Sequence, residues 1–556
     1  MRNLSKLIIA VLLLNLTNSG ATFASAENPV IDEGWVSPDW PIKGKLNLTF
    51  QDKTRGVGSP FLIQNEKVCS SLSDIRCSDP NAFYEYFTRL SKCENFSQMD
   101  CIETITANLD SKTVIGEFVA QFPTKIITPY LSDESLQLPK ADNGGIWEFP
   151  SISNTAGDKY FVNVSMGGVK TKNDKKFVAN FLSASIFGAE IVPIKLRMGR
   201  DGVPDDGSSY VLETTRPDGT STLGAIGIYE PYEDEPLNCV MSGEGKCVNR
   251  KALPKNIRFE LNLRLSNSPS GWFHGRISDP NILIKSLEER SGVSLSISGG
   301  SMDIPAIGFS KPWEQVDKTL QNKYLSGGFG PWTGCRWCST NPLEATTTSQ
   351  PPSYGDAAIA ELTSWLPFIS DRSSADINTW SVRTLDNSEM KGANKCFTKT
   401  AQLNGIVTSN STVYSAGPPK FDGSSLNYQV AAPHLMSNGT IKRGAYTLVI
   451  RSDVARCVYG FSAAPIKASI SIVNDEGVNT LATTTVSEKD NWIKLSAYNF
   501  TYSSPVIKVK LSQTKNQKYS ISCFKGKVIK KVTSTKPKCP VGSRHRSLSQ
   551  NTLINQ

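Results

Sequence analysis

The sequence predicts a mainly β fold: two antiparallel β-sandwich-like domains with short helical disulfide-bonded segments and a basic C-terminal tail. Three observations support this prediction. Apolar and polar residues alternate strictly in several stretches, such as 257–265. Gly, Pro, Asn and Asp separate these stretches, as turns do in antiparallel sheets. Twelve cysteines follow an apolar leader, which favours an exported, disulfide-bonded chain.

Residues 1–26 have the features of a signal peptide. Arg2 and Lys6 precede an apolar run at 7–14, and the small residues 24–26 form a cleavage site. The apolar run is too short to cross a bilayer, and the next one, 177–189, contains a polar residue and several small ones. We therefore expect a secreted or cell-surface protein with no transmembrane span in the mature chain.

Residues 27–110 are predicted to form an N-terminal disulfide-bonded segment with a helix. The helix is expected to start after the Ser-Asp-Pro sequence at 78–80 and to end near Cys93. Phe83, Phe87 and Leu90 would then lie on one face at helical spacing.

Residues 111–310 are predicted to form the larger β-sandwich. Tyr160, Val162 and Val164 alternate with polar neighbours, and the same pattern recurs at 257–265 and 293–297. Strict alternation predicts strands with one buried face and one wet face, as is typical of antiparallel sheets.

Residues 311–385 are predicted to form a helical connector, with a linker near 340–355 that is rich in Ser, Thr and Pro. A capped amphipathic helix is expected behind Asp356 and is expected to stop before Pro367. Alternation returns in 386–512, for which we predict a second, smaller β-sandwich. Lys508 and Lys510 would lie on its outer face, and residues 513–556 complete the chain as the basic tail.

An even number of cysteines in an exported chain favours six disulfides. Three pairs share a spacing of seven intervening residues, so pairing between neighbours is the simplest arrangement. Bridged Cα atoms lie within about 7 Å, whereas eight residues of helix would separate them by about 12 Å, so each such pair must enclose a turn. The alternative is a nested arrangement, 69/101 with 77/93. The predicted neighbour pairs are Cys69/Cys77, Cys93/Cys101, Cys239/Cys247, Cys335/Cys338, Cys396/Cys457 and Cys523/Cys539.

Charge is distributed unevenly along the chain. The net charge is +9, but residues 491–556 contain thirteen Lys and Arg and no Asp or Glu, which leaves −4 for residues 1–490. A block of like charge is typical of a segment that contacts a polyanion. For an exported chain we expect an anionic cell-envelope polymer and no nucleic acid; the alternative is a solvated end without a partner. The polyanion-binding candidates are Lys525, Lys527, Lys530, Lys531, Lys536 and Lys538.

Two segments near the C-terminal end carry distinctive sequences. One is the Arg-Ser-Asp-Val-Ala-Arg-Cys sequence at 451–457, with its surroundings from Tyr446 to Leu511. The other runs from Cys523-Phe-Lys-Gly-Lys through Lys-Lys-Val-Thr at 530–533 to Lys-Pro-Lys-Cys-Pro at 536–540 and Gly542. These two segments resemble uncharacterised exported proteins of actinobacteria. The resemblance implies a bacterial surface or secreted location. It implies no activity, ligand or catalytic residue.

Three further groups of residues are candidate sites. Asp201, Asp205 and Asp206 form a weak calcium candidate, with a solvated turn as the alternative. Apart from this calcium candidate, we expect no cofactor. The Cys335-x-x-Cys338 spacing is that of a redox dithiol, although its loop composition favours a structural bridge. An aromatic platform for sugars, with core packing as the alternative, would be formed by Trp272, Phe273, His274 and Arg276.

The sequence favours a function without catalysis. It contains none of the motifs of serine hydrolases, zincins or P-loop nucleotide enzymes. We expect a binding or structural protein of the bacterial envelope with no catalytic residue. The alternatives are a glycan-active hydrolase, which needs only a pair of carboxylates, and a sugar-binding adhesin.

Overall fold

The computed structural model describes most of residues 83–193, 239–312 and 354–545, and shorter stretches within 48–73, 211–225 and 318–349. The signal peptide predicted for residues 1–26 and most of the linker predicted near 340–355 lie outside the described residues. The described chain is mainly β, with several antiparallel sheets and three disulfides, so the predicted fold class is confirmed. Among the described residues, none of the helices has the length and apolar composition needed to span a bilayer.

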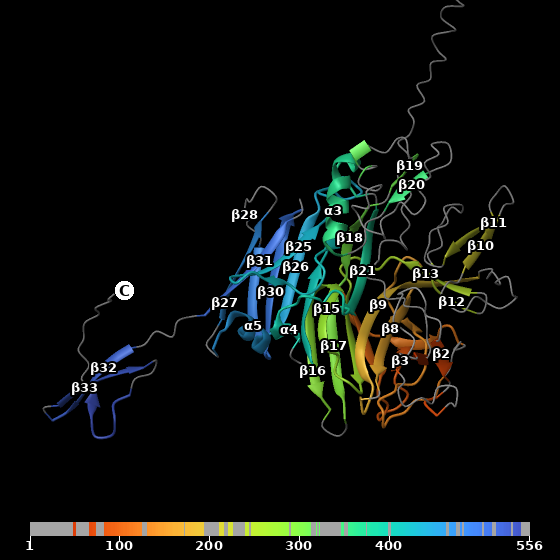
Figure 1. Cartoon of the computed structure of the whole chain (residues 1–556). Coiled ribbons are helices and arrows are strands. Elements are labelled where there is room, and N and C mark those ends of the chain that lie inside the picture. Colours follow the sequence, from red (N-terminus) through yellow and green to blue (C-terminus); the bar gives the residue numbers. More distant parts are fainter. Residues whose placement is uncertain are drawn as a thin grey trace, which may run out of the picture.

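One long sheet, called the main sheet here, runs through the body of the molecule (Figure 1). Its strands are, in spatial order, β2 (Glu66–Cys69), β1 (Leu48–Gln51), β3 (Phe83–Arg89), β8 (Lys159–Lys170), β9 (Val178–Pro193), β21 (Ala375–Thr384), β15 (Gly271–Arg276), β22 (Leu403–Ser409), β26 (Arg443–Arg451), β30 (Trp492–Thr501) and β29 (Thr483–Lys489). Branches from this path are formed by β6 (Glu117–Gln121), β7 (Gly145–Glu148), β12 (Cys239–Gly243), β13 (Lys246–Lys251) and β18 (Met302–Ala306).

Two further sheets cover parts of the main sheet. The first covering sheet consists of β16 (Ser278–Ser286), β17 (Val293–Gly300), β14 (Arg258–Leu265), β4 (Cys101–Leu109) and β5 (Lys112–Ile115). The second covering sheet consists of β23 (Val413–Tyr414), β25 (Leu426–Ala431), β31 (Val506–Gln513), β27 (Ile466–Val473) and β28 (Asn479–Thr480), with β24 (Lys420–Phe421) paired to β25.

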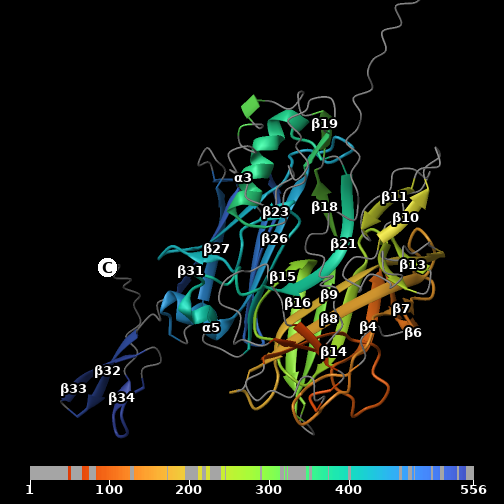
Figure 2. The same cartoon turned by 45° about the vertical axis from the view of Figure 1, so that its right-hand side comes forward.

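The remaining elements are small. The helices whose bounds the structure describes are α3 (Asp356–Trp365), the 3-10 turn η4 (Leu366–Ile369), α4 (Lys395–Thr398) and α5 (Ser452–Tyr459). Two hairpins join β10 (Val211–Thr215) to β11 (Ser221–Ala225), and β19 (Phe309–Pro312) to β20 (Thr346–Ser349). A C-terminal sheet contains β32 (Tyr519–Lys525), β33 (Val528–Ser534) and β34 (Arg544–His545), and it lies apart from the body in both views (Figures 1 and 2).

Each covering sheet encloses a hydrophobic core against the main sheet. In the first core, Phe259 of β14 contacts Tyr160 and Trp380 of the main sheet, with ring centroids 6.0 and 6.1 Å apart. In the second core, Tyr428 of β25 packs on Tyr446 of β26, with ring centroids 5.6 Å apart. The predicted pair of sandwiches therefore corresponds to two covered regions of a single sheet.

Strand β15 joins the two regions. It pairs with β21 antiparallel and with β22 parallel, so a strand from the predicted larger sandwich lies inside the sheet of the smaller one. Trp272 belongs to the second core and its neighbour Phe273 to the first. Successive residues of a strand point to opposite faces. The two covering sheets therefore lie on opposite faces of the main sheet.

The helix predicted between 80 and 93 is wrong, because this segment forms strand β3. Tyr86, Thr88 and Leu90 are buried at alternate positions. The four-residue spacing of Phe83 and Phe87 fits a period of two as well as it fits a helix, and Tyr, Phe and Thr favour strands. By contrast, the helix expected behind Asp356 is confirmed as α3, although Asp356 lies in its first turn and Gly355 is the N-cap residue.

Strand β14 alternates between buried and partly exposed residues over most of its length, as predicted. Strand β8 does not, since Asn163 and Ser165 are as buried as Val162 and Val164. The first core covers one face of β8, and Phe161 packs against Phe187 of β9 on the other. The prediction of a solvent-exposed face is therefore wrong for β8, because the main sheet is covered on both sides there.

Three of the predicted disulfides are present: Cys93 to Cys101, Cys396 to Cys457 and Cys523 to Cys539. The nested alternative, 69/101 with 77/93, is wrong because Cys93 and Cys101 are bonded to each other. Among the described residues no cysteine is free. The side chains of the other six cysteines lie outside the described residues: Cys69, Cys77, Cys239, Cys247, Cys335 and Cys338.

Candidate anion-binding surface

The predicted basic tail is folded between residues 519 and 545, where it forms the C-terminal sheet. Strand β32 pairs with β33 on one side and with β34 on the other. Cys523 of β32 is buried and is bonded to Cys539, with Cα atoms 5.5 Å apart. A sheet of this size buries little apolar surface. Folds this small are commonly stabilised by a disulfide.

The described lysines of this sheet are exposed. Lys530 pairs with Cys523 and Lys531 with Ser522, and both lysine side chains are exposed although adjacent residues point to opposite faces. The neighbouring Val528 and Ile529 are 67% and 64% exposed. This end of the hairpin is therefore open to water on both faces.

Four of the six predicted polyanion-binding residues can be placed: Lys525 lies on β32, Lys530 and Lys531 lie on β33, and Lys538 lies in the segment between β33 and β34. Lys525, Lys530, Lys531 and Lys538 are exposed, and no carboxylate follows Asn491 in the sequence. Lys527 and Lys536 lie outside the described residues. These lysines create a local positive electrostatic potential, and the segment contains no Asp or Glu side chain that would reduce it. Such a potential attracts a negatively charged chain.

The residues of the predicted sugar platform are buried in the protein. Trp272 and Phe273 are each 1% exposed, and His274 and Arg276 are each 2% exposed. They lie on β15 at the centre of the main sheet, where both faces are covered. The prediction of a surface sugar platform is therefore wrong for these residues. They pack in the core, which is the alternative prediction.

His274 and Arg276 belong to a polar cluster at the edge of the second core. The His274 ring stacks on Tyr414 with centroids 3.6 Å apart, and the Arg276 guanidinium lies 4.8 Å from the same ring. Arg383 donates two hydrogen bonds to the buried Glu389 carboxylate, at 2.7 and 2.9 Å, and a third to Tyr414 Oη. No sequence signal identified Glu389, which lies in a turn six residues after Arg383. The ion pair ties that turn to β21.

Sequence reasoning also missed Lys442, a buried lysine just before β26. Its Nζ donates a hydrogen bond to the backbone carbonyl of Asp303, next to the end of the main-sheet branch β18. Burial lowers the pKa of Lys442 to about 8. A single lysine in a loop sequence carries no periodic signal, so its burial appears only in three dimensions.

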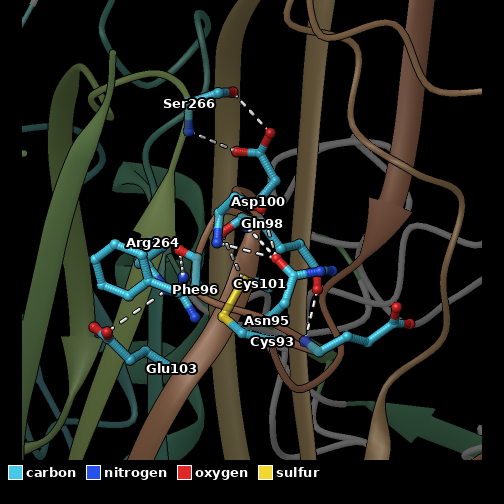
Figure 3. Close-up of a disulfide and its surroundings, with 11 residues drawn as sticks. Cys93, Asn95, Phe96, Gln98, Asp100, Cys101, Glu103, Arg264 and Ser266 are labelled. Atoms are coloured by element: carbon cyan, nitrogen blue, oxygen red, sulfur yellow. Dashed lines mark hydrogen bonds and ion pairs between the residues drawn. A yellow bond between two sulfur atoms is a disulfide. The ribbon is translucent and has the colours of Figure 1, made fainter. Parts of the chain in front are cut away.

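The loop between Cys93 and Cys101 is held against the first covering sheet (Figure 3). Arg264 of β14 donates to the carbonyl of Phe96, and Ser266 donates two hydrogen bonds to the Asp100 carboxylate, at 2.9 and 2.7 Å. Burial raises the pKa of Asp100, and the Ser266 hydrogen bonds offset part of this rise. The Phe96 side chain remains 71% exposed. The contacts of Arg264 and Ser266 therefore hold the loop in place, while its Phe96 ring faces solvent.

The calcium candidates Asp201, Asp205 and Asp206 lie outside the described residues. Elsewhere in the described chain, no group of three or more His, Cys, Asp or Glu is placed to hold a metal ion. One hollow lies between β8, β9 and the end of β14, and its lining contains no carboxylate: Met166, Ala179, Asn180, Phe181, Leu182, Leu265, Asn267, Pro269, Ser270 and Thr384. This hollow does not provide the carboxylate pair of a glycosidase.

Comparisons with protein-family models, with curated proteins and with solved structures found no match to this chain.

Proposed function

We propose that this protein is an exported, non-catalytic binding or structural protein that is held at a bacterial cell envelope by its C-terminal sheet. The observation that carries the proposal is the exposure of Lys525, Lys530 and Lys531 on a small sheet and of Lys538 beside it, in a segment without Asp or Glu. The proposed partner is an anionic wall polymer.

Electrostatics supports this role for the C-terminal sheet. Each phosphate that a lysine neutralises releases a condensed counterion, so affinity arises from several lysines acting together and falls as salt rises. The preceding residues carry a net charge of −4, so the positive charge is concentrated at one end of the chain. A polymer would therefore be attracted to that end first.

The disulfides support the proposed location. Three bridges are present among the described residues, and bonds of this kind persist in oxidising compartments outside the cytosol. The leader-like residues 1–26 agree with export.

The proposal is tested by binding of the purified chain to isolated linear poly(glycerol phosphate) at increasing salt. We expect log affinity to fall linearly with log salt, and the quadruple variant K525Q/K530Q/K531Q/K538Q to bind at least tenfold more weakly at about 0.1 M salt. Affinity that does not depend on salt, or a quadruple variant that binds as the parent does, would contradict the proposal.

A further inference from the structure

The second covering sheet turns a regular polar face away from its core. Along β31, Ile507, Val509 and Leu511 point inward and are buried, whereas Lys508 and Lys510 point outward. The outward side chains of β25, β31 and β27 are called the lysine face here.

A third lysine completes a patch across two strands. Lys467 of β27 is exposed and pairs with Ser512, and Lys510 pairs with Ser469, so these two lysines are diagonal neighbours. Diagonal neighbours and alternate residues of one strand are both separated by roughly 7 Å. Lys467, Lys508 and Lys510 therefore form a row of three positive charges, each within about one Debye length of the next at physiological salt.

The outward positions around these lysines are mostly polar. The other outward residues of β31 and β27 near them are serines, together with the paired Val506 and Val473 at the Lys508 end of the row. Asn427 of β25 is paired with Lys508. Within the described parts of β25, β31 and β27, no outward position holds a carboxylate. The nearby Asp422, in the turn before β25, accepts hydrogen bonds from Asn427, Ser425 and Ser424, which hold the pKa of its carboxyl well below the usual range.

The lysine face is tethered closely to the C-terminal sheet. Strand β31 ends at Gln513 and β32 begins at Tyr519. Six Cα-to-Cα steps span at most roughly 20 Å. Both views place the C-terminal sheet on the side of the molecule where β27 and β31 lie (Figures 1 and 2).

We propose that the lysine face is a second contact for a linear phosphodiester polymer, which binds it together with the C-terminal sheet. This inference rests on the proposed function and extends it from one contact to two. Once one surface holds the polymer, the second contact is intramolecular and has a high effective concentration.

The geometry favours a long polymer over a small anion. The three lysines are arranged in a row across two strands, so a single phosphate group meets only part of the positive charge. A chain with repeated negative charges can follow the row, while serine hydroxyl groups donate hydrogen bonds to phosphate oxygens. The affinity for glycerol phosphate monomer is therefore expected to be at least 100-fold weaker than that for the polymer.

The test compares four folded full-length chains for binding to poly(glycerol phosphate). They are the parent, the face variant K467Q/K508Q/K510Q, the control variant K112Q/K255Q/K285Q and the C-terminal-sheet variant K525Q/K530Q/K531Q/K538Q. The control removes the same charge from exposed lysines in or next to the first covering sheet. We expect the face variant to bind roughly 100-fold more weakly than the parent at about 0.1 M salt, with a log–log salt slope that is shallower by about 2. The control variant is expected to bind within about threefold of the parent.

Each outcome has a separate meaning. A parent chain that does not bind would overturn the proposed function and this inference with it. Binding by the parent with equal loss in the face and control variants would overturn the inference alone. Equally tight binding of a polyuronate of the same length would overturn the assignment to a phosphodiester polymer. Circular dichroism and thermal melting verify that each variant is folded.

Discussion

The two covering sheets have the same architecture but different outer surfaces. On the first, charges of both signs are paired, as in Arg258 with Asp279 and Arg264 with Glu103. On the second, the outward residues beside the lysines are serines, Asn427, Val473 and Val506. Both sheets bury equivalent apolar faces against the main sheet, so packing does not require this difference. The second covering sheet is therefore the one for which we propose an anionic partner.

The largest effect that tests this comparison is expected from Trp272→Ala. Trp272 is on β15, between the two regions, and its ring packs against Phe397 in the second core, with centroids 4.9 Å apart. Loss of this buried ring is expected to reduce the free energy of unfolding by about 3–5 kcal/mol. Because β15 is hydrogen-bonded within a sheet shared by both regions, we expect one unfolding transition, measured by near-UV circular dichroism during denaturation. The partly exposed Trp492 is the control, and its replacement by alanine is expected to cost less. Two separate transitions would show that the regions are independent.

A somewhat smaller effect is expected from the disulfides, one of which lies in each region. The Cys396–Cys457 bridge closes a sequence separation of 61 residues, and the Cys93–Cys101 bridge closes one of 8. Loop-closure entropy predicts stabilisation of about 4 and about 2.5 kcal/mol, respectively. Replacing each pair with serine and measuring urea unfolding checks this order. A greater loss in C93S/C101S than in C396S/C457S would contradict it.

The smallest effect is expected from pH and is confined to the first region. Burial raises the pKa of Asp142 to about 6, although hydrogen bonding from the Asn143 amide and the charge of Lys140 oppose this rise. The folded state therefore binds more protons than the unfolded state between about pH 4 and 6, so stability contributed by this group falls as pH rises through that window. Asp142→Asn is expected to stabilise the protein by roughly 1–3 kcal/mol at pH 7.5 and to have little effect at pH 4. Equal changes in unfolding free energy at both pH values would refute this account.

The sequence predicted the elements whose local pattern has one interpretation. The alternation at 257–265 identified β14, and the apolar spacing behind Asp356 identified α3. The secondary-structure prediction failed at 83–90, because a four-residue spacing of aromatic residues fits both a helix and a strand. Burial of β8 on both faces could not be predicted from alternation, because it depends on which distant strands cover the sheet.

The sequence predicted the composition of the candidate site better than its arrangement. Absence of carboxylates after Asn491 identified the basic C-terminal segment, but not its folding as a sheet around Cys523. The alternation in β31 placed Lys508 and Lys510 on an outer face, but Lys467 joins them only through the pairing of β27 with β31. For β15 the sequence could not distinguish a buried central strand from an exposed aromatic surface, because its long-range partners decide between them.

The central claim, retention at an envelope by charge, is tested most directly by washing intact source cells with increasing salt and measuring released protein by immunoblot. The account predicts that little is released at low salt and most of it below about 1 M, as expected when counterions compete for the polymer. Protein that stays bound at molar salt, or that never associates with the cells, would contradict the claim.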